Sequence, residues 1–429
     1  MVDQPVTLTM LPVIQKWDCH VCGSCCKEYE VRLSEKEAKR VSELSKNMGP
    51  ELGYLQPLRY SGWLTRVAFL NHTSDGACVF LGQGGRCKLH EKHGYDSKPL
   101  PCRLFPWVLV PRGDKWTVGI RFACPSAAEN KGRPIPAHTP ELEEFASELV
   151  VREGLNRGAD GTWAKAPSLD GKMKSTWDHF EVVRQILLDG IEESLTLEQG
   201  IFRAVHWISS MKAGTGMDKL DIKQFGDLAK ILWNQTVLEA EKEYAGAPEK
   251  ADSLSLLLFR QCAAIHTRKD HGPKQGIARR GPLARFLAII RFSVGKGPVP
   301  RLHGWVPEAD FAKAEEQGIN WSAGCEEILR RYYLVKINSG QFAGSVHYRM
   351  SVWDGFASLV LTFPIICWIT RLAEAGRQSD ALIRAISIVD DHFGFNRVLG
   401  GMTQRVFLAI LLNSGRLGKL VRWYGPGRG

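Results

Sequence analysis

Cys19-His20-Val21-Cys22-Gly23-Ser24-Cys25-Cys26 is the stretch of this 429-residue chain that says most about its fold and chemistry. Two cysteines with two residues between them can turn both sulfurs toward one metal, and Gly23-Ser24 supplies a tight bend. The side chains of adjacent residues generally diverge. We therefore expect only one of Cys25 and Cys26 to ligate, while the other serves a second site or a redox role.

The remaining cysteines extend this cluster along the chain. Eight of the 11 cysteines are candidate metal ligands: Cys19, Cys22, Cys25, Cys26, Cys78, Cys87, Cys102 and Cys124. The N-terminus has no signal-peptide pattern, which predicts a cytoplasmic location, and there clustered cysteines indicate metal or redox chemistry more often than disulfides. Cys262, Cys325 and Cys367 lie in apolar helical patterns and are expected to be small buried hydrophobes.

The spacing of the cysteines does not decide which metal they bind. An iron–sulfur cluster, 4Fe-4S in type, suits the compact first run with a fourth thiolate from Cys78, Cys87, Cys102 or Cys124. Zinc takes the same four thiolates, although the later cysteines do not form a second clean CxxC knuckle. Unliganded thiols are the third interpretation. Further candidate ligands are His20, His72, His90 and His93, for each of which a surface or hydrogen-bonded role is commoner.

Strands and helices are expected to alternate around these cysteines. Residues 1–18 read as a lead-in, and Ser34 to Glu37 form a capping box that opens a helix to about Lys46. A strand is predicted over 63–70, and a hairpin over 105–110 and 115–122. Cys102 and Cys124 flank the two ends of that hairpin, which predicts that they lie within reach of one site.

Helical periodicity fills the rest of the chain. Apolar faces at 180–191 and 201–211 are followed by helical patterns at about 219–245, 252–267, 308–317, 323–335, 353–373, 379–391 and 403–412. The predicted fold class is therefore mainly α, with a small cysteine-rich α+β metal-binding module over 1–128 followed by a helical domain over 139–424. Residues 356–369 are apolar but too short for a membrane span, so we expect a buried helix there.

The charge of the chain bears on its partners. The net charge of +10 and the pI near 9.0 favour acidic protein surfaces, nucleic acid or anionic lipid without choosing among them. Residues 268–301 hold nine Lys or Arg and one acidic residue. This Gly/Pro-rich basic loop, with one short helix around 283–291, is either a solvated linker or a landing site for an acidic partner.

A first resemblance rests on the order of the cysteine motifs. CxxCxxCC is followed by Cys78-Val79-Phe80-Leu81, then Cys87-Lys88-Leu89-His90, then 98–106 with the sequence KPLPCRLFP. This order resembles the YkgJ-like cysteine-cluster family over about residues 17–125. The resemblance implies a zinc- or iron-chelating module.

A second resemblance covers the helical part. Arg331-Tyr332-Tyr333-Leu334-Val335, the segment from Trp353 to Ile369, and residues 386–392 are similar to the flagellin lysine N-methylase family. That resemblance implies methyl transfer from S-adenosylmethionine to lysines of a flagellin-like surface protein, with an iron–sulfur centre. Tyr332, Tyr333 and His392 either line a site or pack in the core.

Several motifs of known chemistry are missing from the sequence. It has no glycine-rich strand–turn–helix signature of a Rossmann methyltransferase, no radical S-adenosylmethionine CxxxCxxC run and no phosphate-binding loop. Three hypotheses follow: a protein-lysine N-methyltransferase, a non-catalytic metal-binding or carrier protein, and a redox sensor that uses Cys25 or Cys26.

Overall fold

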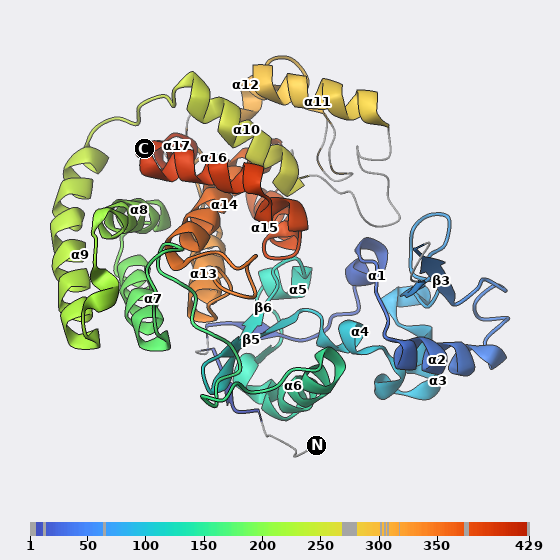
Figure 1. Ribbon diagram of the computed structural model, residues 1–429. Coiled ribbons are helices and arrows are strands. Elements are labelled where there is room, and N and C mark those ends of the chain that lie inside the picture. The colour runs from blue at the N-terminus through green and yellow to red at the C-terminus, as the bar shows by residue number, and fades with distance from the viewer. Residues whose placement is uncertain are drawn as a thin grey trace.

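The computed structural model describes residues 6–11, 14–62, 66–267, 281–300, 303, 306, 309–316, 318–372 and 377–426. Figure 1 shows the long helices gathered on one side of the molecule, helices α1–α4 with strand β3 on the other, and strands β5 and β6 between them. The fold is mainly α with a small α+β N-terminal region, as the sequence predicts.

The N-terminal region contains short elements. Its helices and strands are β1 (Leu8–Thr9), β2 (Lys16–Trp17), α1 (Ser24–Glu28), α2 (Glu35–Leu44), β3 (Leu58–Ser61), β4 (Val67–Leu70), α3 (Lys88–His93), α4 (Leu100–Leu104), β5 (Trp107–Arg112), β6 (Lys115–Ile120), α5 (Pro125–Ala128) and β7 (Arg133–Pro134). The predicted capping box is present: Ser34 Oγ accepts from the Glu37 amide, and the Glu37 side chain accepts from the Ser34 amide.

The predicted hairpin is confirmed as β5 and β6, which pair antiparallel from Trp107↔Ile120 to Arg112↔Lys115. The predicted lead-in over residues 1–18 contains two short strands that the sequence did not indicate. Strand β1 pairs in parallel with β6, and β2 pairs antiparallel with β7. Strand β4 falls within the predicted strand over 63–70, of which residues 63–65 lie outside the described chain, and it pairs with β3.

The second region consists of helices. They are α6 (Thr139–Glu153), α7 (Trp177–Glu192), α8 (Leu197–Ala213), α9 (Ile222–Ala245), α10 (Ser253–Thr267), α11 (Pro282–Val294), α12 (Phe311–Ala314), α13 (Ala323–Asn338), α14 (Val352–Leu372), α15 (Gln378–His392), α16 (Met402–Asn413) and α17 (Arg416–Tyr424). Within the predicted basic loop, α11 is longer than the short helix expected there. Residues 268–280 and 301 of that loop lie outside the described residues.

Helix α14 forms the centre of the helical body. It packs against α8, α15 and α17, and 94% of its apolar window is buried inside the protein. It is the one helix of the described chain that is long and apolar enough to cross a membrane. Its burial confirms the predicted core helix.

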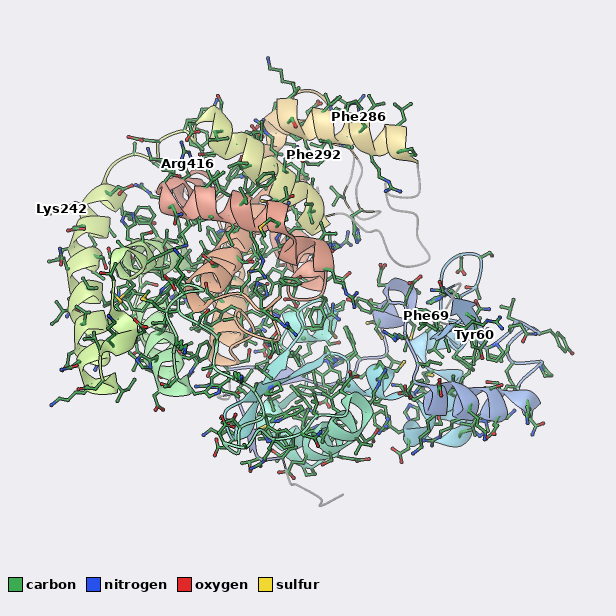
Figure 2. All side chains as sticks on the ribbon, in the orientation of Figure 1. Tyr60, Phe69, Lys242, Phe286, Phe292 and Arg416 are labelled. Carbon is green, nitrogen blue, oxygen red and sulfur yellow. The ribbon has the colours of Figure 1, made fainter. Side chains whose placement is uncertain are left out.

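Two apolar cores divide the buried residues. The larger core holds the helical body together with the β5–β6 hairpin and α5. The smaller core gathers residues of segments 33–58 and 68–89, and Cys26, Cys87 and Cys102 pack against it. Figure 2 shows Tyr60 and Phe69 in this smaller part, apart from the densely filled helical body. The smaller core therefore places several cysteines together.

Candidate metal centre

The CxxCxxCC run forms an exposed loop that leads into α1. Val21 and Gly23 both adopt positive φ angles, +54° and +70°, which bend the chain on either side of Cys22. Cys19 and Cys22 are exposed, whereas Cys25 and Cys26 are half-buried in α1. The Gly23 bend predicted from sequence is therefore present.

The glycine-rich turn over 82–85 packs directly on this loop. Gly85 has φ of +81°, and a Cβ placed there would lie 1.8 Å from the carbonyl oxygen of Val21. A Cβ on Gly23 would lie 3.3 Å from Leu81 Cδ1. Only glycine permits such a close approach at positive φ, so the turn over 82–85 packs against the backbone of the cysteine loop and limits its movement.

Cys25 and Cys26 do not diverge as expected for adjacent residues. Their sulfurs lie 4.0 Å apart. Two thiolates bound to one zinc at about 2.3 Å with a tetrahedral angle are separated by about 3.8 Å. The adjacent pair is therefore spaced as two ligands of a single tetrahedral ion would be.

Three later cysteines approach α1 through the smaller core. The Cys78 amide donates to the carbonyl oxygen of Cys26 at 2.7 Å, and this bond ties the Cys78 turn to α1. An isolated bridge pairs Leu81 with Cys87, and Cys102 lies on α4. Cys78 is buried, while Cys87 and Cys102 are half-buried.

The thiols of this group act on one another electrostatically. Burial raises the pKa of Cys78 to about 12, and the charges of Cys87 and Cys25 add to the effect. Burial also raises the pKa of Cys102 well above its usual range, followed by the charges of Cys78, Cys25 and Cys87. The pKa of Cys25 is raised well above its usual range by its hydrogen bond with Cys26, then by burial. A bound cation would offset this mutual repulsion, because it favours the thiolate form.

Of the other three cysteines, Cys22 and Cys124 lie near each other, and Cys19 is exposed in the loop. Cys124 is buried, and its pKa is raised to about 11 by burial, with a further contribution from the charge of Cys22. The ring of His20 makes a 3.1 Å hydrogen bond through Nδ1 with Ser126 Oγ, just after Cys124. Among the described residues, no three His, Cys, Asp or Glu side chains have the spacing of ligands around one ion.

The remaining sequence candidates have other roles. His72 Nε2 makes a 3.2 Å hydrogen bond with the carbonyl oxygen of Tyr29, and burial lowers its pKa. Cys262, Cys325 and Cys367 are buried in the helical body, which confirms the prediction made for them. The raised pKa of Cys25 is the reverse of what a reactive redox thiol needs.

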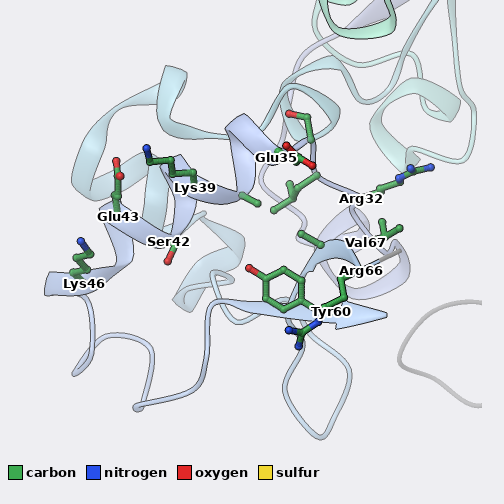
Figure 3. Close-up of a pocket in the computed structure, with 13 residues that line it drawn as sticks. Arg32, Glu35, Lys39, Ser42, Glu43, Lys46, Tyr60, Arg66 and Val67 are labelled. Atoms are coloured by element: carbon green, nitrogen blue, oxygen red, sulfur yellow. The ribbon is translucent and has the colours of Figure 1, made fainter. Parts of the chain in front are cut away.

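An open groove of about 840 Å³ lies between α2 and the β3–β4 hairpin. Figure 3 shows Lys39, Glu43 and Lys46 on the helix side and Tyr60 and Arg66 on the hairpin side. Among the described residues, its lining contains charged, polar and apolar side chains but no cysteine or histidine. The groove is therefore separate from the thiols.

The sequence did not indicate the buried contacts between residues 121–128 of the cysteine module and helices α13 and α15 of the helical body. We call this interface the joint. The Asp390 carboxylate on α15 accepts from the amides of Phe122 and Ala123, at 2.6 and 3.2 Å, just before Cys124. It also pairs with Lys336 Nζ at 2.6 Å, and both side chains are fully buried. Tyr332 lies within the same joint, and its hydroxyl donates to Asp390 Oδ1 at 3.3 Å.

A second contact of the joint centres on Arg121. Its guanidinium pairs with Asp391 Oδ1 at 2.9 Å and lies over the rings of Tyr29, Phe105 and Phe395. Tyr29 follows Cys25 and Cys26, and Phe105 follows Cys102. The contacts of Arg121 therefore position the segments of the chain that follow Cys26 and Cys102.

Buried histidines lie on the helical side of the joint. His347 Nε2 is 3.2 Å from Ser358 Oγ, and burial lowers the pKa of both His347 and His266 to about 3. The charges of His266, Lys336 and Arg405 lower the pKa of His347 further. Tyr333 is also buried, with its hydroxyl 2.8 Å from Thr362 Oγ1. These residues pack in the core.

Comparison with known proteins gives a match for the cysteine module alone. Residues 18–125 match the CxxCxxCC family model, described as a "Putative zinc- or iron-chelating domain". All eight clustered cysteines fall inside this match, which ends one residue after Cys124. No curated protein and no solved structure matches the chain. The all-sulfur donor set and the 4.0 Å spacing of Cys25 and Cys26 fit such a chelating domain.

Proposed function

We propose that the cysteine module binds a metal centre through the thiolates of Cys78, Cys87 and Cys102, with the fourth from the Cys25–Cys26 pair. The observation that carries this proposal is that Cys26, Cys87 and Cys102 pack against the smaller core that contains Cys78, and that the charges of Cys25 and Cys87 reach both Cys78 and Cys102. The metal supplies the positive charge that keeps buried thiolates ionised. The protein supplies the loop, the glycine turn and the joint that hold the sulfurs.

The form of the centre is proposed as an iron–sulfur cluster. In a 4Fe-4S cluster each cysteine binds its own iron, so the sulfurs need not converge on one point as they must around one zinc ion. The wide spread of Cys78, Cys87 and Cys102 along the sequence is compatible with this. Zinc is the rival, and the Cys25–Cys26 spacing supports it.

The test is the iron, zinc and acid-labile sulfide content of anaerobically purified protein. Iron and sulfide in matched amounts would support the cluster, and zinc without sulfide would end that part of the proposal. Cys78→Ser should lose most of the metal, whereas Cys325→Ser, a buried cysteine of the helical body, should keep it. Equal metal content in both variants would contradict the proposed ligand set.

We also propose, as a second function, protein-lysine N-methylation with S-adenosylmethionine on a flagellin-like or other protein substrate in the cytoplasm. It is supported by the resemblance of residues 331–335 and 386–392 to flagellin methylases, and by the place of both segments in the joint. The attacking lysine must be neutral, which a desolvated site achieves by lowering its pKa. Tyr332 and Tyr333 are fully buried and would form part of the apolar packing beneath such a site.

This second function is tested by equilibrium dialysis with labelled S-adenosylmethionine on the metal-loaded protein. Saturable binding near one molecule per chain is expected. Absence of binding, with the metal present and the chain folded by circular dichroism, would refute the methylase and leave the metal-binding proposal standing.

A further inference from the structure

Helix α11 carries an apolar face that points away from the protein. Five side chains at i, i+3, i+4, i+7 and i+11 are between 42% and 69% exposed: Leu283, Phe286, Leu287, Ile290 and Val294. At 100° per residue they fall within an arc of about 100° on the helix surface. They form what we call the α11 stripe.

The opposite side of the same helix is buried. Ala288 and Phe292 face the protein, and the Phe292 ring lies 5.3 Å from that of Phe311 and 6.3 Å from that of Trp368. Figure 2 shows Phe286 on the outer side of α11 and Phe292 on the side turned toward the other helices. Surface helices normally turn polar side chains outward, so the stripe needs a separate explanation.

The helix is held firmly with its stripe outward. Gln261 on α10 donates to the Ile289 carbonyl oxygen at 3.2 Å and to Ser293 Oγ at 3.0 Å. Arg260, paired with Glu315, donates to the Ser293 carbonyl oxygen at 3.3 Å. These bonds fix α11 on α10, so the exposure of the stripe is a property of the fold.

The charged residues of the segment that carries the stripe all have one sign. Residues 281–300 contain Arg285, Arg291 and Lys296 and no acidic residue. Arg291 and Lys296 are both exposed. An apolar helical face with basic residues beside it is complementary to an anionic lipid surface, where the apolar side chains enter the headgroup–acyl boundary.

We propose that the α11 stripe docks on an anionic lipid bilayer, with the helix parallel to the membrane plane and Arg291 and Lys296 at the phosphates. The stripe itself offers no hydrogen-bonding group, which suits a bilayer interior better than the mixed polar and apolar surface of a protein partner. This inference is independent of the metal centre and of methylation. It predicts a peripheral membrane contact.

The test is co-sedimentation of the full-length, metal-loaded chain with vesicles of phosphatidylcholine, with and without phosphatidylglycerol. We expect binding to the anionic vesicles that weakens as salt rises. The double variant Phe286→Ser/Ile290→Ser should lower the partition coefficient by at least about tenfold, because two inserted apolar side chains are lost. The control Val151→Ser/Leu195→Ser, at exposed apolar positions elsewhere, should stay within about twofold of wild type.

Three results would overturn the proposal. The first is no binding to anionic vesicles at low salt. The second is equal binding by wild type and the Phe286→Ser/Ile290→Ser variant. The third is self-association of the wild type that this variant abolishes in sedimentation velocity, since the stripe would then be covered by a second copy of the chain.

Discussion

The fully buried pair of Lys336 and Asp390 should dominate the stability of the joint. Asp390 accepts from two backbone amides and from Lys336, and Lys336 also donates to Gln341 Oε1 at 2.9 Å. Burial lowers the pKa of Lys336, and the Asp390 carboxylate opposes that effect. Removing either partner leaves the other in a site from which water is excluded.

The expected magnitude follows from this geometry. Breaking a buried pair by removing one partner costs about 3–5 kcal/mol. At about 2 °C per kcal/mol for a large domain, Asp390→Asn and Lys336→Met should each lower Tm by roughly 6–10 °C. The double variant should cost less than the sum of the two by about 0.5–3 kcal/mol, since no unpaired charge remains.

The assay is thermal unfolding followed by circular dichroism on metal-loaded protein at fixed salt. The exposed pair of Lys419 and Glu249, 2.8 Å apart, provides the matched control. Lys419→Met should change Tm far less than either buried variant, because water screens that exposed pair. Additive single effects, or a Tm change for Asp390→Asn as small as for Lys419→Met, would refute the reasoning.

Two further predictions concern the glycine turn and the buried histidines. Gly85→Ala should lower the metal content sharply, because its Cβ would clash with the Val21 carbonyl oxygen. Gly84 is also at positive φ, but a Cβ there would have nothing within 4 Å, so Gly84→Ala should destabilise the fold by only about 1–2 kcal/mol and keep the metal. Equal metal loss in both variants would contradict the packing argument. The helical body should lose stability as pH falls from about 6.5 toward about 3, because the folded-state pKa of His347 is lowered to about 3 and the unfolded chain takes up its proton first. In acid titrations monitored by circular dichroism, His347→Gln should reduce this loss and His93→Gln, which is exposed, should not; no difference between them would contradict the assignment.

Much of the helical fold could be predicted from local patterns. The apolar positions Phe180, Val183, Leu187 and Ile191 are all buried on α7, as their spacing indicates. Strands β1 and β2 have two residues each, and no periodicity can be read from two residues. Their pairing depends on partners more than 100 residues away, as between Leu8 and Trp116.

The candidate site could be predicted in composition but not in arrangement. Spacing identified the eight cysteines and the Gly23 bend. It did not show that the Cys78 amide bonds to Cys26, because that contact depends on the fold of the segment between them. Nor did it show which thiols lie close enough to affect one another. The pKa of Cys102 is raised in part by the charges of Cys78, Cys25 and Cys87, whereas the pKa of Cys124 is raised in part by the charge of Cys22.

The joint explains why the helical body matters to the metal module. The family match ends at residue 125, but the amides of Phe122 and Ala123 need Asp390, 268 and 267 residues later in the chain. The carbonyl oxygens of Ala127 and Ala128 likewise accept from Arg331 at 3.1 and 2.6 Å. Without the helical body these groups on both sides of Cys124 would lose the partners that fix their positions. The cysteine sequence therefore provides the ligands, while residues of α13 and α15 hold in place the chain that carries Cys124.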